Sequence, residues 1–382
     1  MTAVAEAPHV LATDDVPDYC RPHLSSLARA DQRRWGEAYV HGLVTIPGRK
    51  SIRRIADEVV GRRADQNLQQ FVNQSTWKWD PVRRSVAGHV TDLVRPQAWV
   101  ALDAVFAKEG TNSVGVARQY VPSLGKVLNC QLGLALCLVG ERAGCPVNWR
   151  LLLPRCWDGD MSRRLRTHLP DNQRHQSRWS HLLKEVDQTM QAWQLRPMPL
   201  LVDATDEPNL DTKLRMLEQR GLSYVVRASP TARASRWPLL QGHVPTVGEI
   251  AGMAGRSNSP LMWQSWSDNR WPGTRIIAAS MPHHGQTWSG CQPAPVPQQL
   301  VIRWRASSPR DKALWLTNLR QARLPELAAL LDRYDAAADA LQEMDHTVGL
   351  QHFEGRSFPG WHHHVTLASM AYAYTLGKAV AG

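Results

Sequence analysis

Two aspartates of this 382-residue chain stand in apolar surroundings that are typical of buried strands. Asp103 lies within the run WVALDAVFA, and Asp203 ends the run LLVD. An ionised carboxylate removed from water needs a cationic partner, a metal ion or a raised pKa. Two carboxylates at neighbouring strand ends are a minimal holder for Mg²⁺, and a third acid would allow two ions and phosphodiester hydrolysis or strand transfer. In the alternative interpretation, Asp103 caps a turn or pairs with an arginine such as Arg118.

The elements that must position these two residues follow a recognisable order. Apolar periodicity predicts strands, then alternating helices and strands, then two long helices. The predicted strands are 99–106, 113–120, 127–139, 149–153, 200–203, 222–227, 300–305 and 313–316, and the predicted helices of this part are 179–193, 210–220, 325–348 and 364–376. This order is that of an α/β, ribonuclease-H-like mixed sheet flanked by helices. In such a sheet the first strand and the first strand after a helix are neighbours, so Asp103 and Asp203 could face each other.

Changes in composition divide the chain into segments. Residues 1–22 lack periodicity and are expected to form a flexible arm. Residues 23–95 carry helical spacing and predict a helical N-terminal domain. The ribonuclease-H-like core is expected at 96–227 and 300–382, interrupted by a β-rich or irregular insertion at 228–299 that is rich in Pro, Gly, Ser and Trp.

The charge of the chain favours a polyanionic partner. Lys and Arg outnumber Asp and Glu by 45 to 34, for a formal net charge of +11. Arg-rich proteins of this kind often bind phosphate backbones. The candidate DNA-binding residues are Arg53, Arg54, Arg163, Arg164 and Arg166. The competing interpretation is that these arginines belong to solvated helix faces and connections.

The cysteine pattern indicates the compartment. Six cysteines form no CxxC pair, and no signal peptide precedes them, so we expect reduced thiols in a cytoplasmic protein. The longest apolar run, 132–140, is far shorter than the roughly 18 residues of a membrane span. A membrane partner is therefore not expected.

Histidines near the C-terminus could extend the site. His362, His363 and His364 are consecutive, and on a helix their side chains diverge by about 100°, so they cannot share one metal ion and are expected to serve packing. The residues that could approach the cleft between the two aspartates and the long helix are Arg118, His352, Glu354 and Arg356.

Four runs of the sequence resemble bacterial insertion-sequence transposases of the DDE superfamily. They are SVGVARQYVPSLGKVLNCQ, NWRLLLPRCW, LEQRGLSYVV and HFEGRSFPGWHHHVTLASMAYA, and NLQQFVNQSTW resembles the N-terminal helical region of these proteins. The resemblance implies a ribonuclease-H-like catalytic domain, an inserted β region, and cut-and-paste chemistry with two Mg²⁺ ions on an Asp, Asp, Glu triad. Asp103 and Asp203 match the first two acids and would be the metal ligands.

The third acid of the family pattern is not matched. Counting back from HFEGR, the family Glu falls on Ala337 or Ala338, and a Lys that follows it falls on Asp345. Asp339 is the nearest substitute as a catalytic residue, although one position along a helix turns a side chain by about 100°. Asp335 and Glu343 are more distant substitutes.

Three functions follow from this pattern. In the first, the chain has a non-functional triad and is retained as a DNA-binding or regulatory protein. In the second, the former cleft acts on a small molecule as a repurposed enzyme, which predicts an enclosed apolar pocket between Asp103 and the long helix. In the third, the chain is an active Mg-dependent transposase with a displaced acid. Mg²⁺ is a cofactor only if the ancestral site still works, and a homodimer is a further expectation.

Overall fold

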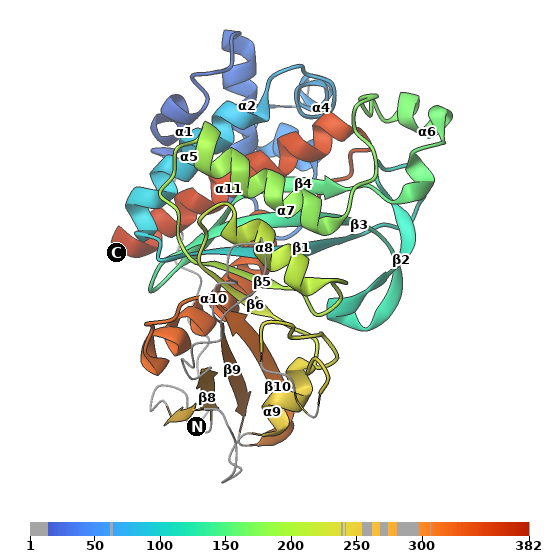
Figure 1. The fold of residues 1–382 in the computed structure, drawn as a ribbon. Helices are drawn as coiled ribbons and strands as arrows, with labels where there is room; N and C mark the ends of the chain where they lie inside the picture. The colour runs from blue at the N-terminus through green and yellow to red at the C-terminus, as the bar shows by residue number, and fades with distance from the viewer. Residues whose placement is uncertain are drawn as a thin grey trace, which may run out of the picture.

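The computed structural model describes residues 14–61, 64–237, 240, 242–253, 262–267, 274–280, 298–305 and 307–381. The chain begins with helices that pack on one another (Figure 1). They are α1 (Val16–His23), α2 (Ala30–Thr45), α3 (Ile52–Ile55), α4 (Asp65–Asn73) and α5 (Trp79–Val94), with a short π-helical turn at Ala56–Val60. The described helices include none that is both long and apolar enough to cross a bilayer.

One mixed sheet runs through the molecule. Its strands are β1 (Ala98–Ala107), β2 (Ala117–Val121), β3 (Lys126–Val139), β4 (Gly144–Leu152), β5 (Leu200–Asp203), β6 (Tyr224–Arg227), β7 (Met262–Ser267), β8 (Thr274–Ser280), β9 (Gln299–Arg305) and β10 (Ser308–Thr317). Their order is β2-β3-β1-β5-β6-β10-β9-β8-β7, and β4 also pairs with β3. The mixed α/β fold predicted from the sequence is confirmed, and β1 and β5 are parallel neighbours.

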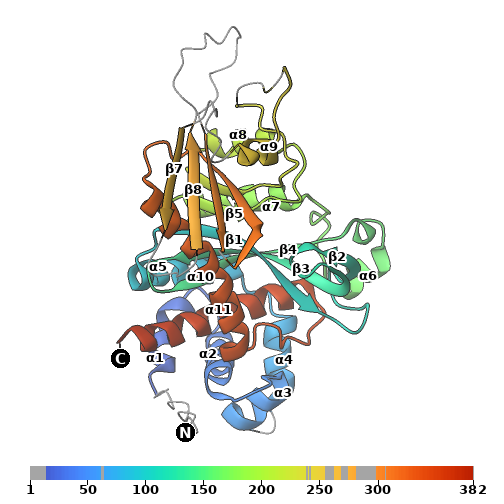
Figure 2. The ribbon, with the colours of Figure 1, turned by 90° about the horizontal axis from the view of Figure 1, so that it is seen from below.

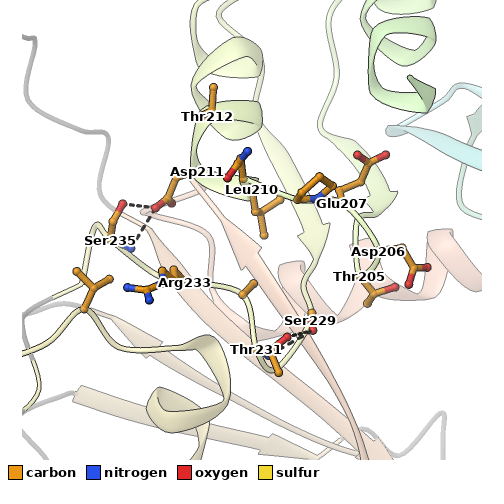
Figure 3. A pocket seen from close by; sticks show the side chains of 14 residues that line it. Thr205, Asp206, Glu207, Leu210, Asp211, Thr212, Ser229, Thr231, Arg233 and Ser235 are labelled. Carbon is orange, nitrogen blue, oxygen red and sulfur yellow. Dashed lines mark hydrogen bonds between the residues drawn. The ribbon is translucent and has the colours of Figure 1, made fainter. Parts of the chain in front are cut away.

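Helices cover both faces of this sheet (Figures 1 and 2). They are α6 (Met161–Arg166), α7 (Arg178–Asp187), α8 (Leu210–Glu218), α9 (Val247–Gly252), α10 (Leu324–Val348) and α11 (Phe358–Ala381). Figure 2 shows α7 and α8 on one side, α10 and α11 on the other, and α1 to α4 beyond α11, whereas α5 packs directly on β3 and β4. The carboxyl ends of β5 and β6 open on a cavity of about 550 Å³ (Figure 3).

Two segments contain a helix that was not predicted from the sequence. Residues 16–22, expected within a flexible arm, belong to α1, where Tyr19 packs inward and its hydroxyl donates to the Met370 carbonyl oxygen. Residues 1–13 lie outside the described residues. The candidate DNA-binding residues Arg163, Arg164 and Arg166 lie where no helix was predicted, and the structure places them in α6, whose N-terminus is capped by Asp160. Side-chain contacts thus order both segments.

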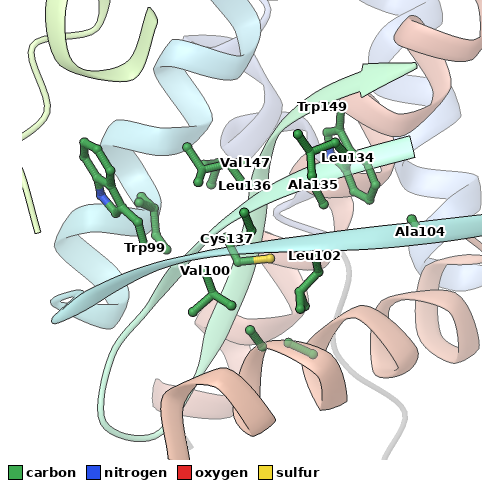
Figure 4. Close-up of a cluster of buried hydrophobic side chains, with 14 of the residues drawn as sticks. Trp99, Val100, Leu102, Ala104, Leu134, Ala135, Leu136, Cys137, Val147 and Trp149 are labelled. Atoms are coloured by element: carbon green, nitrogen blue, oxygen red, sulfur yellow. The ribbon is translucent and has the colours of Figure 1, made fainter. Parts of the chain in front are cut away.

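The main core lies where β1, β3 and β4 face α10 and α11 (Figure 4). Figure 4 shows Val100 and Leu102 of β1 on the side of α10, beside Cys137 of β3. Trp99 and Trp149 are fully buried, and the Trp149 indole donates to Ser369 of α11 at 2.8 Å. Apolar strand residues on both faces therefore fix β1 at the centre of the sheet.

The three consecutive histidines of α11 are buried, and each makes separate contacts. His362 stacks on Trp79, and its Nδ1 atom accepts a hydrogen bond from the Arg83 guanidinium at 3.1 Å. His363 bonds backbone carbonyls of Val72 and Trp77, and His364 lies between the Tyr39 hydroxyl and the Leu350 carbonyl. Burial lowers the pKa of all three, to about 4 for His363 and His364. The packing role expected from the sequence agrees with these contacts.

A second polar group lies inside the protein on α7. Glu185 is 0% exposed, and neither of its carboxylate oxygens bonds a described residue. Burial raises its pKa to about 8, although the charges of Arg150 and Arg83 act in the opposite direction. One turn earlier on the same helix, His181 is also buried without a hydrogen bond to a described residue. The helix therefore carries two titratable groups whose neutral forms are favoured.

Candidate functional site

The two aspartates stand at the carboxyl ends of parallel neighbours. The register aligns Ala101 of β1 with Val202 of β5, so Asp203 is the next residue along β5 and Asp103 lies two residues along β1. The structure thus brings these predicted site residues to one edge of the sheet. Ligand sites of open parallel sheets form at such carboxyl ends.

Each aspartate binds an arginine. The Arg178 Nε atom lies 2.6 Å from Oδ1 of Asp103, and the Arg227 Nη1 atom lies 3.1 Å from Oδ2 of Asp203. The other oxygen of Asp203 accepts from the backbone N–H and the hydroxyl of Thr205, at 2.9 and 2.7 Å. Asp103 therefore has an arginine partner, as in the alternative weighed from the sequence, but this partner is Arg178 instead of Arg118.

Arg178 links the two strand ends. It is the first residue of α7, whose N-terminus is capped by the side chain of Ser177. Besides its bond to Asp103, it donates to the Asp203 backbone carbonyl at 3.1 Å. Although burial alone would lower the pKa of Arg178, the Asp103 charge raises it overall. A permanently charged guanidinium is thus fixed between the two aspartates.

This arrangement does not fit a pair of Mg²⁺ ions. Three of the four carboxylate oxygens of Asp103 and Asp203 already accept hydrogen bonds, two of them from cations. Mg²⁺ binds through anionic or carbonyl oxygens that are free to coordinate. Within the described parts of the chain, no three His, Cys, Asp or Glu side chains cluster closely enough to hold an ion together. The side chains as placed therefore offer no two-metal site.

The long helix α10 presents an apolar face to Asp103. Asp103 lines a cavity of about 320 Å³ together with Val105 and Phe106 of β1 and with Ala338 and Leu341 of α10. Ala338, one of the two positions that match the family Glu, is thus the one that borders this cavity. Its lining is mainly apolar, as the second of the three functions predicts, but it is open to solvent on one side.

The proposed substitute acid points elsewhere. Asp339 follows Ala338 on α10, is exposed, and does not line the cavity that contains Asp103. Tyr334, four residues before Ala338 on α10, interacts electrostatically with both Asp103 and Asp203. Burial raises the pKa of its phenol, and the charges of the two aspartates raise it further, whereas those of Arg227 and Arg178 lower it. The helix therefore turns a phenol and an alanine toward the paired aspartates.

A larger cavity lies beyond Asp203. Its lining comes from the loop after β5, the start of α8 and the segment after β6, and Figure 3 shows hydroxyl and carboxylate side chains around it. Glu207 pairs with Lys213, and Asp211 accepts hydrogen bonds from Ser235. Asp206 is exposed on the rim. These acids have protein partners or face solvent, so they do not complete a triad with Asp203.

The candidate cleft residues lie on separate elements. His352 accepts from the Lys50 N–H at 3.2 Å, and burial lowers its pKa. Glu354 pairs with Arg49 at 2.5 Å, whereas Arg356 is exposed. Arg118 is exposed on β2. None of these residues lines the cavity that contains Asp103, although their neighbour Gln351 does.

The candidate DNA-binding arginines divide into surface and interior residues. The side chain of Arg53 is 87% exposed, and Arg54 pairs with Glu58 on the same helical face. Arg163 stacks over Trp157 with its guanidinium carbon 4.0 Å from the ring centre, and Arg166 is exposed. The predicted DNA-binding role of Arg164 is wrong. Its side chain is 1% exposed and donates to backbone carbonyls around α6, so it stabilises that segment instead of facing a ligand.

Sequence reasoning missed Arg178 and Arg227. Arg227 ends β6, and the register places it directly beside Asp203. The runs LLVD and YVVR are both short apolar strands that end in a charge, so their parallel alignment could have suggested this pair. No comparable signal points to Arg178, which is 75 residues from Asp103 and reaches it through the packing of α7.

Comparison with known proteins identifies the family. A sequence model described as DDE superfamily endonuclease matches residues 22–251, which is more than half of the chain. No curated protein matches the chain. The matched segment contains both aspartates, and the mixed sheet with β1 beside β5 agrees with the family's ribonuclease-H-like architecture. The family resemblance seen in the sequence is therefore confirmed, and the chain belongs to the DDE superfamily of endonucleases, with a transposase-like origin.

Proposed function

We propose that this chain is a transposase-like DNA-binding protein with a regulatory role, and that it does not catalyse strand transfer with two metal ions. The proposal rests on one observation: Arg178 and Arg227 bind the two aspartates that would hold the ions. A cation beside each carboxylate offsets the negative charge that attracts a metal. The former metal site then contributes to the stability of the sheet edge.

Arginines of α3, of α6 and of the loop before α11 support a DNA partner, since Arg53, Arg166 and Arg356 are exposed and Arg54 and Arg163 are half-buried. We call the basic band the set formed by Arg53, Arg54, Arg163, Arg166 and Arg356. Arginine side chains contact phosphate oxygens without reading the base sequence. A net charge of +11 adds long-range attraction for DNA.

Contacts between distant segments connect the members of the basic band. Arg49, which precedes α3, pairs with Glu354 in the loop that also carries Arg356. The Arg356 carbonyl accepts a hydrogen bond from the segment 114–116, and Arg163 of α6 donates to the same segment. The segment before α3, the loop that carries Arg356, and α6 are therefore linked in series by these contacts.

Salt-dependent binding tests the DNA proposal. A fluorescently labelled 30-base-pair duplex of arbitrary sequence is titrated with protein at 50 to 300 mM salt, and the affinity is expected to fall linearly in log salt. Arg166→Gln and Arg356→Gln should each weaken binding and reduce the salt slope by about 1. Arg142→Gln is the matched control, because Arg142 is exposed in the turn between β3 and β4, at the far end of β3 from β2. A wild-type protein that binds no duplex would refute the proposal.

A cleavage assay tests the loss of strand transfer. Supercoiled plasmid is incubated with the protein and Mg²⁺ or Mn²⁺, and no nicked or joined product is expected. Nicking that disappears in Asp203→Ala would instead support the third function, an active transposase in which Asp339 or another acid completes the site.

The cavity between β1 and α10 favours a second candidate, an enzyme or binding protein for a small apolar molecule. Its volume of about 320 Å³ is at the lower end of the range for small-molecule sites. Ala338→Trp would fill it without touching the basic band. A fragment library screened by ligand-observed NMR should then give hits that disappear in this variant, whereas hits that persist would place the ligand elsewhere.

A further inference from the structure

A polar cleft separates α2 and α4 in the N-terminal helices. Its volume is about 220 Å³. On one side it is lined by Asn67, Gln70 and Gln74 of α4 and of the residue that follows it, and on the other side by Gln32 and Trp35 of α2. A second cavity, of about 360 Å³, shares Trp35 with the first. The half-buried side chain of Trp35 therefore borders both cavities.

The helix turns three amides toward this cleft. Asn67, Gln70 and Gln74 are spaced by three and four residues, which places them within about 60° of one another around the helix axis. Leu68, farther around the helix, is buried and holds the helix in place, and Phe71, also buried, forms part of the lining of the cleft. All three amides are exposed, and none makes a side-chain hydrogen bond to a described residue. Their donors and acceptors are therefore available to a ligand.

The chemistry of this cleft matches the edge of a nucleobase. A primary amide presents a donor and an acceptor in one plane, and this pair complements N6 and N7 of adenine. Aromatic side chains provide a surface on which unpaired bases stack. The one acid of the lining, Asp31, is paired with Arg29 at 2.9 Å. The cleft therefore offers amides and an indole with little net charge.

Size and surroundings favour a base of DNA over a metabolite. The cleft is smaller than the roughly 300 Å³ at which drug-sized pockets begin, so it suits one planar group that remains attached to a chain. Arg34 is exposed on α2, and Arg53 lies on α3, which packs against both α2 and α4. Arg34 lines the neighbouring cavity together with Trp35, a position from which it could meet a phosphate of a strand whose base enters the cleft.

We propose that this cleft binds an unpaired adenine of a DNA strand, with the amides of Gln70 and Gln74 on the base edge and Trp35 against its face. The proposal rests on the DNA-binding function proposed above and adds a base preference to it. The basic band would supply affinity for any DNA, and the cleft would supply discrimination.

The test compares single-stranded dA20, dT20 and dC20 by fluorescence anisotropy at one salt concentration. The wild-type protein should prefer dA20 by about fivefold to hundredfold, the range expected for one amide–adenine pair. The double substitution Gln70→Ala with Gln74→Ala should abolish the preference while keeping the affinity for dT20. Alanine favours helix, so α4 is expected to persist, and circular dichroism verifies this. Gln69→Ala is the matched control, because Gln69 is an exposed amide of α4 outside the cleft.

Each outcome separates the cleft proposal from the DNA-binding proposal. Equal binding of the three strands by the wild-type protein would overturn the adenine proposal and leave DNA binding intact. A preference that survives in the double variant, or disappears equally in Gln69→Ala, would also overturn it. A protein that binds neither the strands nor the duplex would refute both. Trp35→Phe gives an independent readout, since it should weaken binding of all three strands through reduced stacking.

Discussion

Replacing Glu185 by Gln should stabilise the protein at neutral pH and leave it almost unchanged at pH 5. Glu185 has no exposed surface, and its pKa in the folded protein is about 8, chiefly because burial penalises the charged form. In the unfolded chain the same group titrates near 4.5. Between these two pH values the folded state holds a proton that the unfolded state releases. The free energy of unfolding therefore decreases as the pH rises from about 4.5 to about 8.

The size of the effect follows from the width of this interval. Each pH unit is worth about 1.4 kcal/mol, so at pH 7 the contribution lost is about 3 kcal/mol, and at pH 5 it is under about 1 kcal/mol. Gln keeps the shape of the protonated carboxyl group and does not titrate. Glu185→Gln is thus expected to exceed the wild-type protein in stability by about 3 kcal/mol at pH 7, with the gap closing toward pH 5.

Urea unfolding followed by tryptophan fluorescence at pH 5, 6, 7 and 8 measures this difference. Other buried groups, such as His181, whose pKa burial lowers to about 4, also change the stability below about pH 6.5, but they are present in both proteins and cancel in the comparison. Asp187→Asn on the same helix is a control that changes an accessible, paired carboxylate. A stability difference that is independent of pH would show that Glu185 is ionised in the folded state, beside Arg150 or Arg83, and would refute this reasoning.

Three further outcomes are expected. Gly140→Ala should lower the melting temperature and destabilise the protein by about 1–3 kcal/mol or more, because the new methyl carbon would lie 1.9 Å from the carbonyl oxygen of Val94. Gly159→Ala is the control and should have little effect, because open space surrounds Gly159. Arg178→Ala should leave Asp103 without its cation, so calorimetric titration should detect Mn²⁺ binding that the wild-type protein lacks; equal binding by both proteins would contradict the blocking role. His363 and His364, whose pKa burial lowers to about 4, contribute stability above pH 6.5 that is lost as the pH falls toward 4. Urea unfolding midpoints that stay constant between pH 6.5 and pH 4 would contradict the burial of these two histidines in the neutral form.

Much of the sheet could be predicted because its central strands are apolar. The strand 200–203 was predicted with the bounds that β5 has, since LLVD is bordered by prolines before it and acids after it. The predicted strand 113–120 begins too early, because Gly115 takes a positive φ of 70° and the segment before β2 bonds to the loop at Arg356. A local pattern of apolar residues contains no information about such long-range contacts.

The site was predictable only in part. The neighbourhood of Asp103 and Asp203 follows from strand order, a rule of topology that needs no side-chain detail. Their pairing with Arg178 depends on how α7 lies against the sheet, which no local pattern records. The interior position of Arg164 was hidden for a similar reason, since a charged residue in a basic segment resembles its exposed neighbours until α6 folds around it.

The continuous sheet has a consequence for how the molecule opens. Strands β1 and β5 stand near its middle, with β3 on one side and β6 followed by four more strands on the other. Local unfolding starts where strands lack a neighbour, and the central amides exchange their hydrogens last. The strands that carry the two aspartates thus have a neighbour on each side, although the aspartates themselves stand near the ends of the β1–β5 pairing. Fraying at β2 or β7, the two end strands, is therefore expected to leave the spacing between Asp103 and Asp203 unchanged.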